Sequence, residues 1–78
     1  MKSMTCQQLG GACDLAFQAE TFDEIAQMSK DHGMKMFQKG DQAHLKSMKQ
    51  MTQLMQTPKE MQKWFDARRT EFNALPST

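Results

Sequence analysis

The sequence predicts a small α+β protein in which an N-terminal β-hairpin packs on one helix and is followed by a two-helix antiparallel hairpin. Strand-like alternation is confined to the first twenty residues, and helix-spaced apolar residues follow from position 22 to position 75. Two capping motifs begin helices within that second stretch. A chain of 78 residues has room for one domain. We divide it into residues 1–39, the hairpin with the first helix, and residues 40–78, the helical hairpin extension.

The hairpin is predicted from two short segments, residues 2–6 and 13–19, on either side of a Gly-Gly pair. Paired glycines adopt the positive φ that a tight turn requires. Alternation with polar or small residues predicts an inward face on the second segment. The residues on that face are Cys13, Leu15 and Phe17.

The first helix is predicted to begin at Phe22, because Thr21 and Glu24 have the spacing of a capping box. It is predicted to end after residue 39, where Gly40 supplies a C-terminal cap. Gly33 lies inside this helix and costs about 1 kcal/mol relative to alanine. We therefore expect a break in the helix at that glycine.

The second helix is predicted to begin after Asp41 as N-cap and to end near Gln56. A third helix follows at once, since Thr57 is a good N-cap and Pro58 suits the first helical position. Pro76 ends it. The very short turn between these two helices predicts that they pack as an antiparallel hairpin.

Composition excludes several classes of function. Ten basic and nine acidic residues give a net charge of +1, without the one-signed face that nucleic-acid binding requires. No apolar run reaches the length of a membrane span or a signal peptide, so we expect a cytoplasmic protein without a membrane partner. The sequence has no Gly-rich phosphate loop, Ser-His-Asp set or rigid carboxylate pair, and we predict that the protein is not an enzyme. A protein partner and the oligomeric state stay open.

Three residues form the candidate metal site: Cys6, Cys13 and His32. A hairpin that presents two thiolates beside a helix that presents an imidazole suits tetrahedral Zn²⁺. The six-residue spacing between the cysteines is longer than in most zinc knuckles, and alternatives stay open. The side chains are also compatible with buried cysteines beside a core histidine, or with a thiol pair that forms a disulfide across the hairpin.

Part of the sequence resembles a prokaryotic family of short proteins that are predicted to be small metal-binding proteins. The resemblance covers about residues 1–36, and the segments that carry it are Cys6-Gln7-Gln8-Leu9-Gly10-Gly11-Ala12-Cys13-Asp14, Glu20-Thr21-Phe22-Asp23-Glu24 and Asp31-His32-Gly33-Met34. It implies that Cys6, Cys13 and His32 are ligands. The family's first histidine falls on Gln27, so the resemblance implies only three protein ligands in this chain.

The fourth ligand has several candidates. His44 lies at the start of the next helix, and a thioether from Met28 or Met36 or a water molecule would also complete the shell. Asp14 is expected on the opposite strand face. If the site uses the family pattern, Gln27→His should restore a Cys2His2 set and raise zinc affinity at least about tenfold.

Nine methionines are the most unusual feature of the composition. We expect most of them to fill the core, with Trp64 and Phe65 as aromatic anchors. An adaptable groove for a partner helix, or thioether ligands for Cu(I), are the alternatives. The leading functional hypothesis is thus a small intracellular metal-binding or metal-stabilised interaction module, for zinc or another thiophilic ion. Its rivals are a metal-free helical interaction module with a Met-rich face and a thiol redox protein.

Overall fold

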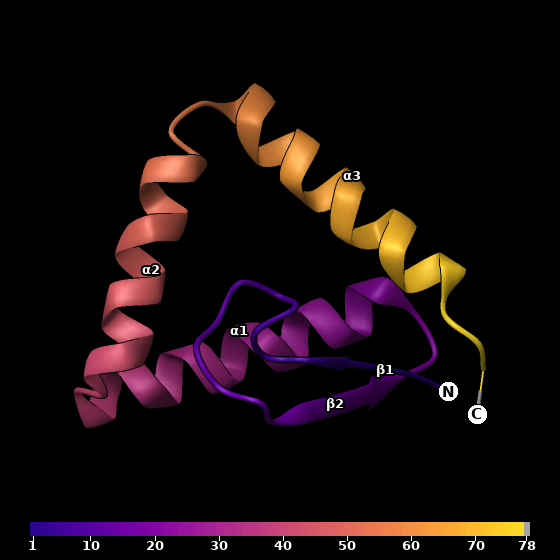
Figure 1. Ribbon diagram of the computed structural model, residues 1–78, viewed down its shortest axis with the longest axis horizontal. Helices are drawn as coiled ribbons and strands as arrows, with labels where there is room; N and C mark the ends of the chain where they lie inside the picture. The colour runs from indigo at the N-terminus through magenta and orange to yellow at the C-terminus, as the bar shows by residue number, and fades with distance from the viewer. Residues whose placement is uncertain (78) are drawn as a thin grey trace.

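The computed structural model describes residues 1–77 and has a two-stranded antiparallel sheet followed by three helices (Figure 1), which confirms the α+β class. The elements are β1 (Lys2–Thr5), β2 (Ala16–Ala19), α1 (Phe22–Lys39), α2 (Gln42–Leu54) and α3 (Pro58–Ala74).

The sheet is shorter than predicted. β1 and β2 pair with Met4 opposite Phe17, and both of these side chains are buried. Residues 6–15 form a long loop between the strands instead of a tight turn, although Gly10 does take the expected positive φ of 93°. Leu15 lies in this loop and is 47% exposed, so the prediction that it points inward is wrong. The two cysteines are therefore carried by the loop, just outside the strands.

The predicted helix starts are confirmed, and α1 contains no break. Thr21 and Glu24 form both hydrogen bonds of the capping box, and Gly40 ends the helix with φ of 72°. The expected break at Gly33 is wrong, because one glycine costs only about 1 kcal/mol. Capping at both ends and burial of Phe22 and Ile25 stabilise the helix by more than that amount.

The core lies between the sheet, the first turns of α1 and the last turns of α3. Its buried members are Met4, Cys6, Leu9, Phe17, Ala19, Phe22, Ile25 and Phe72. The rings of Phe22 and Phe72 meet edge to face at 6.1 Å between centroids. Lys2 Nζ donates to the carbonyl oxygen of Asn73 at 2.9 Å, which ties β1 to the end of α3.

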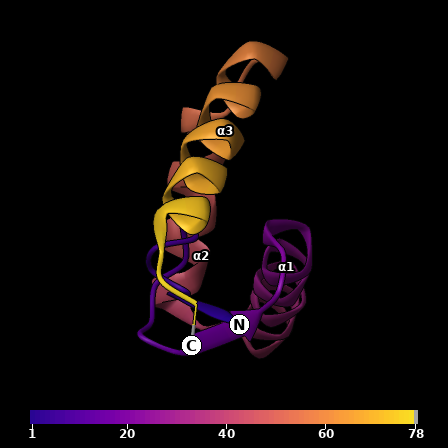
Figure 2. The same cartoon turned by 90° about the vertical axis from the view of Figure 1, so that its right-hand side faces the viewer.

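The three helices enclose a triangle around the Cys-bearing loop (Figure 1), and the molecule is only 15 Å thick along its shortest axis. α2 and α3 diverge from the turn that joins them, so the prediction of a packed antiparallel helical hairpin is wrong. Seen from the side, α1 stands apart from α2 and α3 across an open V (Figure 2). The divergence arises because each of the last two helices is anchored at the end farther from their common turn.

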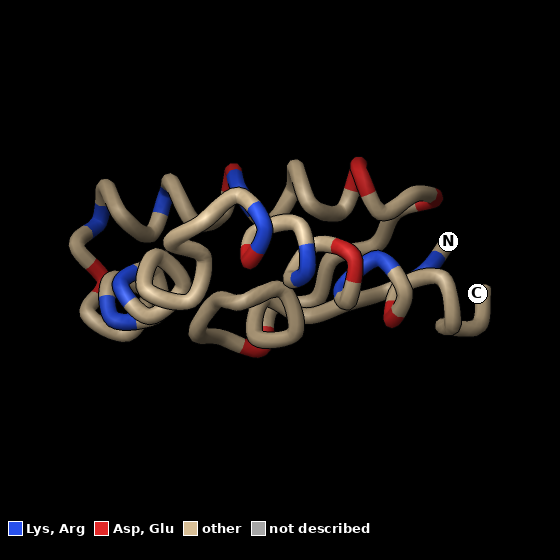
Figure 3. Tube along the Cα trace, turned by 90° about the horizontal axis from the view of Figure 1, so that it is seen from above, with Lys and Arg blue, Asp and Glu red and all other residues tan. Residues whose placement is uncertain are grey.

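This open arrangement leaves most methionines outside the core. Met4 is the only methionine among the buried residues of the described chain, while Met34 and Met61 are 55% and 43% exposed. Trp64 is half-buried and Phe65 is exposed, so these side chains are not core anchors. Basic residues (Lys and Arg) and acidic residues (Asp and Glu) are interspersed along the helices (Figure 3). Within residues 1–77, no helix has both the length and the apolarity needed to cross a bilayer.

Candidate metal centre

Four side chains from three separate segments meet at one point: Cys6, Cys13, His32 and His44. Their sulfur and imidazole nitrogen atoms all lie within 4.8 Å of one another. The structure thus brings together the three residues predicted from the sequence and adds His44 from the set of candidates for the fourth position. Both cysteines are free thiols.

Cys6 is held at the end of β1 by the loop that folds around it. The amide of Gly11 donates to the Cys6 carbonyl oxygen at 2.7 Å, and the amide of Leu9 donates to the same oxygen at 3.1 Å. A Cβ at Gly11 would lie 2.1 Å from Cys6 Sγ, far inside van der Waals contact. Glycine at position 11 is therefore a steric requirement of the cluster.

Cys13 and His32 form the second pair of the cluster. The amide of Gln7 donates to the Cys13 carbonyl oxygen at 3.0 Å, which fixes the returning limb of the loop. His32 lies on the inner face of α1, and its ring meets the buried Phe17 ring edge to face at 5.7 Å. This contact directs His32 Nε2 to within 3.3 Å of Cys13 Sγ.

His44 is oriented by Asp41, the N-cap of α2. Asp41 Oδ2 accepts from the His44 amide at 3.0 Å and lies 2.6 Å from His44 Nδ1. An ionised carboxylate only accepts, so Nδ1 carries the hydrogen and Nε2 faces Cys6 Sγ at 3.6 Å. The hydrogen bond from the His44 side chain lowers the pKa of Asp41, which keeps that acceptor charged. Carboxylate–histidine pairs of this kind orient metal-bound histidines.

The spacing of the donor atoms fits a tetrahedral zinc ion. Zinc bonds to sulfur and nitrogen imply separations of about 3.3–3.8 Å between neighbouring ligand atoms. The distances between Cys13 Sγ and His32 Nε2, 3.3 Å, and between Cys6 Sγ and His44 Nε2, 3.6 Å, lie in this range. The two imidazole rings meet at 78°, so their nitrogens converge while the rings stay unstacked. The residues present therefore fit Zn²⁺ in donor type and number, and two of their pairs already have the spacing of a tetrahedral site.

The surroundings of Cys6 disfavour ionisation of its thiol unless a positive charge lies nearby. Burial raises the pKa of the Cys6 thiol, and hydrogen bonds from the backbone amides of Cys13 and Ala12 oppose that shift only in part. Burial therefore disfavours the charged form of Cys6, and a cation beside its sulfur would favour it. A bound divalent metal ion supplies that charge directly.

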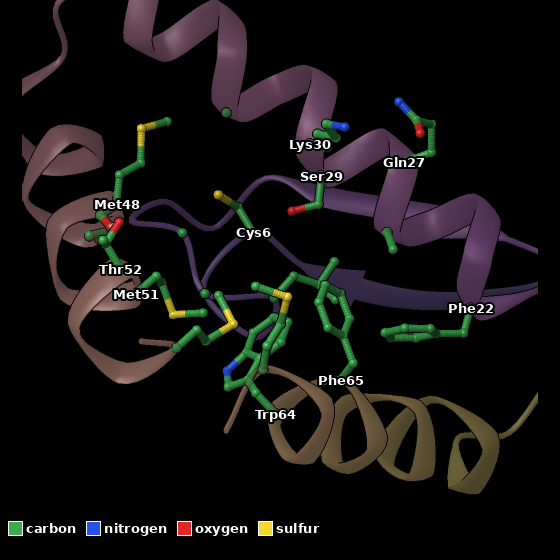
Figure 4. Close-up of a pocket in the computed structure, with 18 of the residues that line it drawn as sticks. Cys6, Phe22, Gln27, Ser29, Lys30, Met48, Met51, Thr52, Trp64 and Phe65 are labelled. Atoms are coloured by element: carbon green, nitrogen blue, oxygen red, sulfur yellow. The ribbon is translucent and has the colours of Figure 1, made fainter. Parts of the chain in front are cut away.

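The other sequence candidates lie elsewhere. Gln27 is exposed, donates to Asp31 Oδ1 at 3.0 Å and points away from Cys6 in Figure 4. Asp14 and Met28 are also exposed. Asp41 was expected only as a helix cap, and its contact with the His44 ring was not foreseen. The signal was present in the three-residue spacing of Asp41 and His44, since an N-cap reaches the third helical residue.

Comparisons with protein-family models, with curated proteins and with solved structures found no match. The resemblance of residues 1–36 to small metal-binding proteins therefore stays a prediction. The functional argument depends on the geometry of the four side chains and of Asp41.

Proposed function

We propose that the protein is a small metal-binding protein that holds one Zn²⁺ ion through Cys6, Cys13, His32 and His44. The observation that carries this proposal is the convergence of four soft and borderline donors within 4.8 Å. Zinc is favoured because two thiolates and two imidazoles are one of its common structural donor sets. Another thiophilic ion would use the same donors.

The hydrogen bond to Asp41 favours a metal over simple packing. A core histidine needs its polar atoms satisfied, and thiols are weak hydrogen-bond partners. His44 Nδ1 already has a strong acceptor in Asp41, and Nε2 is left directed at Cys6 Sγ. This is the arrangement in which a metal-bound imidazole has its free N–H fixed by a carboxylate.

The proposed role of the ion is structural. Four protein ligands complete a tetrahedral shell and leave no position for a reacting water molecule. Cys6 and His44 are only 2% and 5% exposed, so little of either side chain is accessible for a reaction. The ion would join the loop, α1 and α2, and so stabilise a chain with few buried apolar residues.

Elemental analysis of protein purified without chelator tests the proposal. We expect one zinc per chain in the parent protein. Cys6→Ser and His44→Ala should each lose the metal, because three remaining ligands bind zinc much more weakly. Asp14→Asn is the matched control: Asp14 adjoins Cys13 but is exposed, so this variant should keep one metal per chain.

The rival functions predict different results. Metal-free parent protein, with a melting temperature that Cys6→Ser does not change, would favour a metal-free interaction module. A reversible disulfide between Cys6 and Cys13, detected as a mass difference of two hydrogens, would favour a thiol redox protein. Replacement of the metal by Co²⁺ gives a further check, because thiolate ligation produces sulfur-to-metal charge-transfer absorption. Its absence in a folded, cobalt-loaded protein would contradict the proposed ligand set.

A further inference from the structure

An apolar pocket of about 680 Å³ lies between the three helices and the Cys-bearing loop (Figure 4). Its floor is the Cys-bearing loop, and its walls come from α1, α2 and α3. The residues that define its shape are Leu9, Phe22, Met48, Met51, Trp64 and Phe65. The volume lies within the range of small-molecule sites, which are also lined mainly by apolar and aromatic side chains.

The floor of this pocket is shaped by Gly10. A Cβ at Gly10 would lie 3.0 Å from both Sδ and Cε of Met51 and 3.2 Å from Cζ2 of Trp64. These two side chains therefore approach each other over the bare backbone of the glycine. Methionine adapts its shape to a bound group more readily than branched residues do. The pocket thus has a defined base and an adaptable wall.

The polar groups in the pocket leave one positive charge uncompensated. Arg69 lines the pocket but pairs with Asp23 at 3.1 Å. Lys30 and Ser29 also line it, and neither has a hydrogen bond or ion pair within residues 1–77. Figure 4 shows the Ser29 hydroxyl directed toward the pocket. Lys30 therefore supplies the pocket with an unpaired ammonium group, which is suited to bind a carboxylate.

We propose that this pocket binds a small anionic amphiphile, an apolar chain or ring system that carries one carboxylate. The headgroup would contact Ser29 and Lys30, and the apolar body would lie between Met51 and Trp64. A partner helix fits less well, because it is about 10–12 Å wide and needs an elongated groove. The pocket is instead bounded on three sides by helices in a molecule 15 Å thick. Cys6 and His44 border both this pocket and the proposed metal centre, but the ligand contacts proposed here involve neither residue.

Trp64 is the only tryptophan of the chain, so its fluorescence reports on the pocket directly. The full chain as purified is titrated with dodecanoate, dodecanol and dodecyltrimethylammonium below their micelle concentrations. We expect dodecanoate to change the Trp64 emission saturably, with one molecule bound per chain by calorimetry. It should bind more tightly than the neutral and the cationic probe.

Two pairs of variants separate the headgroup contact from the apolar contact. Lys30→Gln should weaken dodecanoate binding about threefold to fivefold, the effect of one exposed charge pair, and leave dodecanol binding unchanged. Lys35→Gln, on the same helix but outside the pocket, should change neither. Met61→Glu should weaken both probes at least about tenfold by placing a carboxylate in the wall. Met34→Glu is its control, since both methionines are well exposed and only Met61 lines the pocket.

Several results would overturn the proposal. These are the absence of a saturable Trp64 response to dodecanoate, equal affinity for the cationic probe, or an equal loss of affinity in Lys35→Gln. Sedimentation velocity provides one more test. A stable dimer that dodecanoate does not dissociate, and that Met61→Glu does, would mean that a second copy of the chain covers the pocket.

Discussion

The candidate metal centre and the apolar pocket share Cys6 and His44, yet they are built in opposite ways. Four polar side chains that are distant in the sequence converge within 4.8 Å at the centre. Around the pocket, apolar side chains that share a regular helical spacing stay apart and leave about 680 Å³ between them. Helical periodicity identifies the apolar face of a helix, but it does not determine what covers that face.

The difference follows from where the last two helices are anchored. α2 is fixed at its first turn, where Asp41 holds His44 in the cluster. α3 is fixed at its last turns, where Phe72 packs on Phe22. The turn between α2 and α3 is remote from both anchors (Figure 1). The apolar residues near that turn therefore line an open space, although their spacing matches that of core residues.

If the proposed zinc ion is bound, its removal is expected to be the largest of the changes predicted here. Structural zinc contributes on the order of 10 kcal/mol of apparent binding free energy at neutral pH, and that energy is available only to the folded site. Because 78 residues bury few apolar side chains, excess chelator should abolish most of the cooperative unfolding transition. Circular dichroism during heating, with and without chelator, measures this change.

Hydrogen exchange shows which region loses structure. On chelation, amides of the Cys-bearing loop, such as those of Gln7 and Gly11, should lose protection first. Restoring zinc is the control and should return it. An unchanged melting curve in chelator would mean that the core alone stabilises the fold, and that the four side chains are not held by an ion.

Two phenylalanines of α3 compare packed and open surroundings within one helix. Phe72 is 2% exposed in the core, and Phe65 is 36% exposed at the pocket. Phe72→Ala should cost about 3–5 kcal/mol of unfolding free energy, as other large-to-small core changes do. Phe65→Ala should cost less, about 1 kcal/mol, because more than a third of this residue is already exposed to water. Urea denaturation measures both. Equal losses would mean that the triangle is closed in solution.

Whether the sequence predicts a structural feature depends on how far apart in the chain the interacting residues are. The capping box of Thr21 and the glycine cap at Gly40 involve neighbouring residues, and both were predicted correctly. Three cluster residues were predicted because their chemistry is distinctive. The choice of His44, and the divergence of α2 from α3, depend on contacts between distant segments. Sequence spacing carries no direct information about such contacts.

The charge of Asp41 can be tested without removing the helix cap. Asparagine is as good an N-cap as aspartate, so Asp41→Asn should keep α2 intact. It replaces the carboxylate that fixes His44 Nδ1 by a neutral amide, and changes to such outer partners typically lower metal affinity 10–100-fold. A competition titration with a chromophoric chelator measures the affinity, and circular dichroism checks the helix. Unchanged affinity would show that Asp41 acts only as a cap.

The smallest expected change in zinc affinity is that of Gln27→His. The resemblance to small metal-binding proteins predicts instead that this variant binds zinc more tightly. His32 lies five positions after Gln27, and five positions advance a helix by about 500°, so the two side chains point roughly 140° apart. α1 is continuous through Gly33, so no local distortion brings them together. His44 already supplies the fourth donor. We therefore expect Gln27→His to leave zinc affinity unchanged within about twofold, well below the tenfold change that a new ligand gives.

The double variant Gln27→His/His44→Ala makes this test decisive, because it offers an imidazole on α1 in place of the one lost from α2. If the cluster geometry is fixed by the core, the new imidazole cannot turn inward, and the double variant should bind zinc as weakly as His44→Ala alone. The Gln27 side chain is exposed, so the Gln27→His substitution should not affect folding in the single or the double variant. Recovery of tight binding would show that α1 can rotate or unwind near Gly33, and that the fourth position of the site is set by whichever imidazole is available.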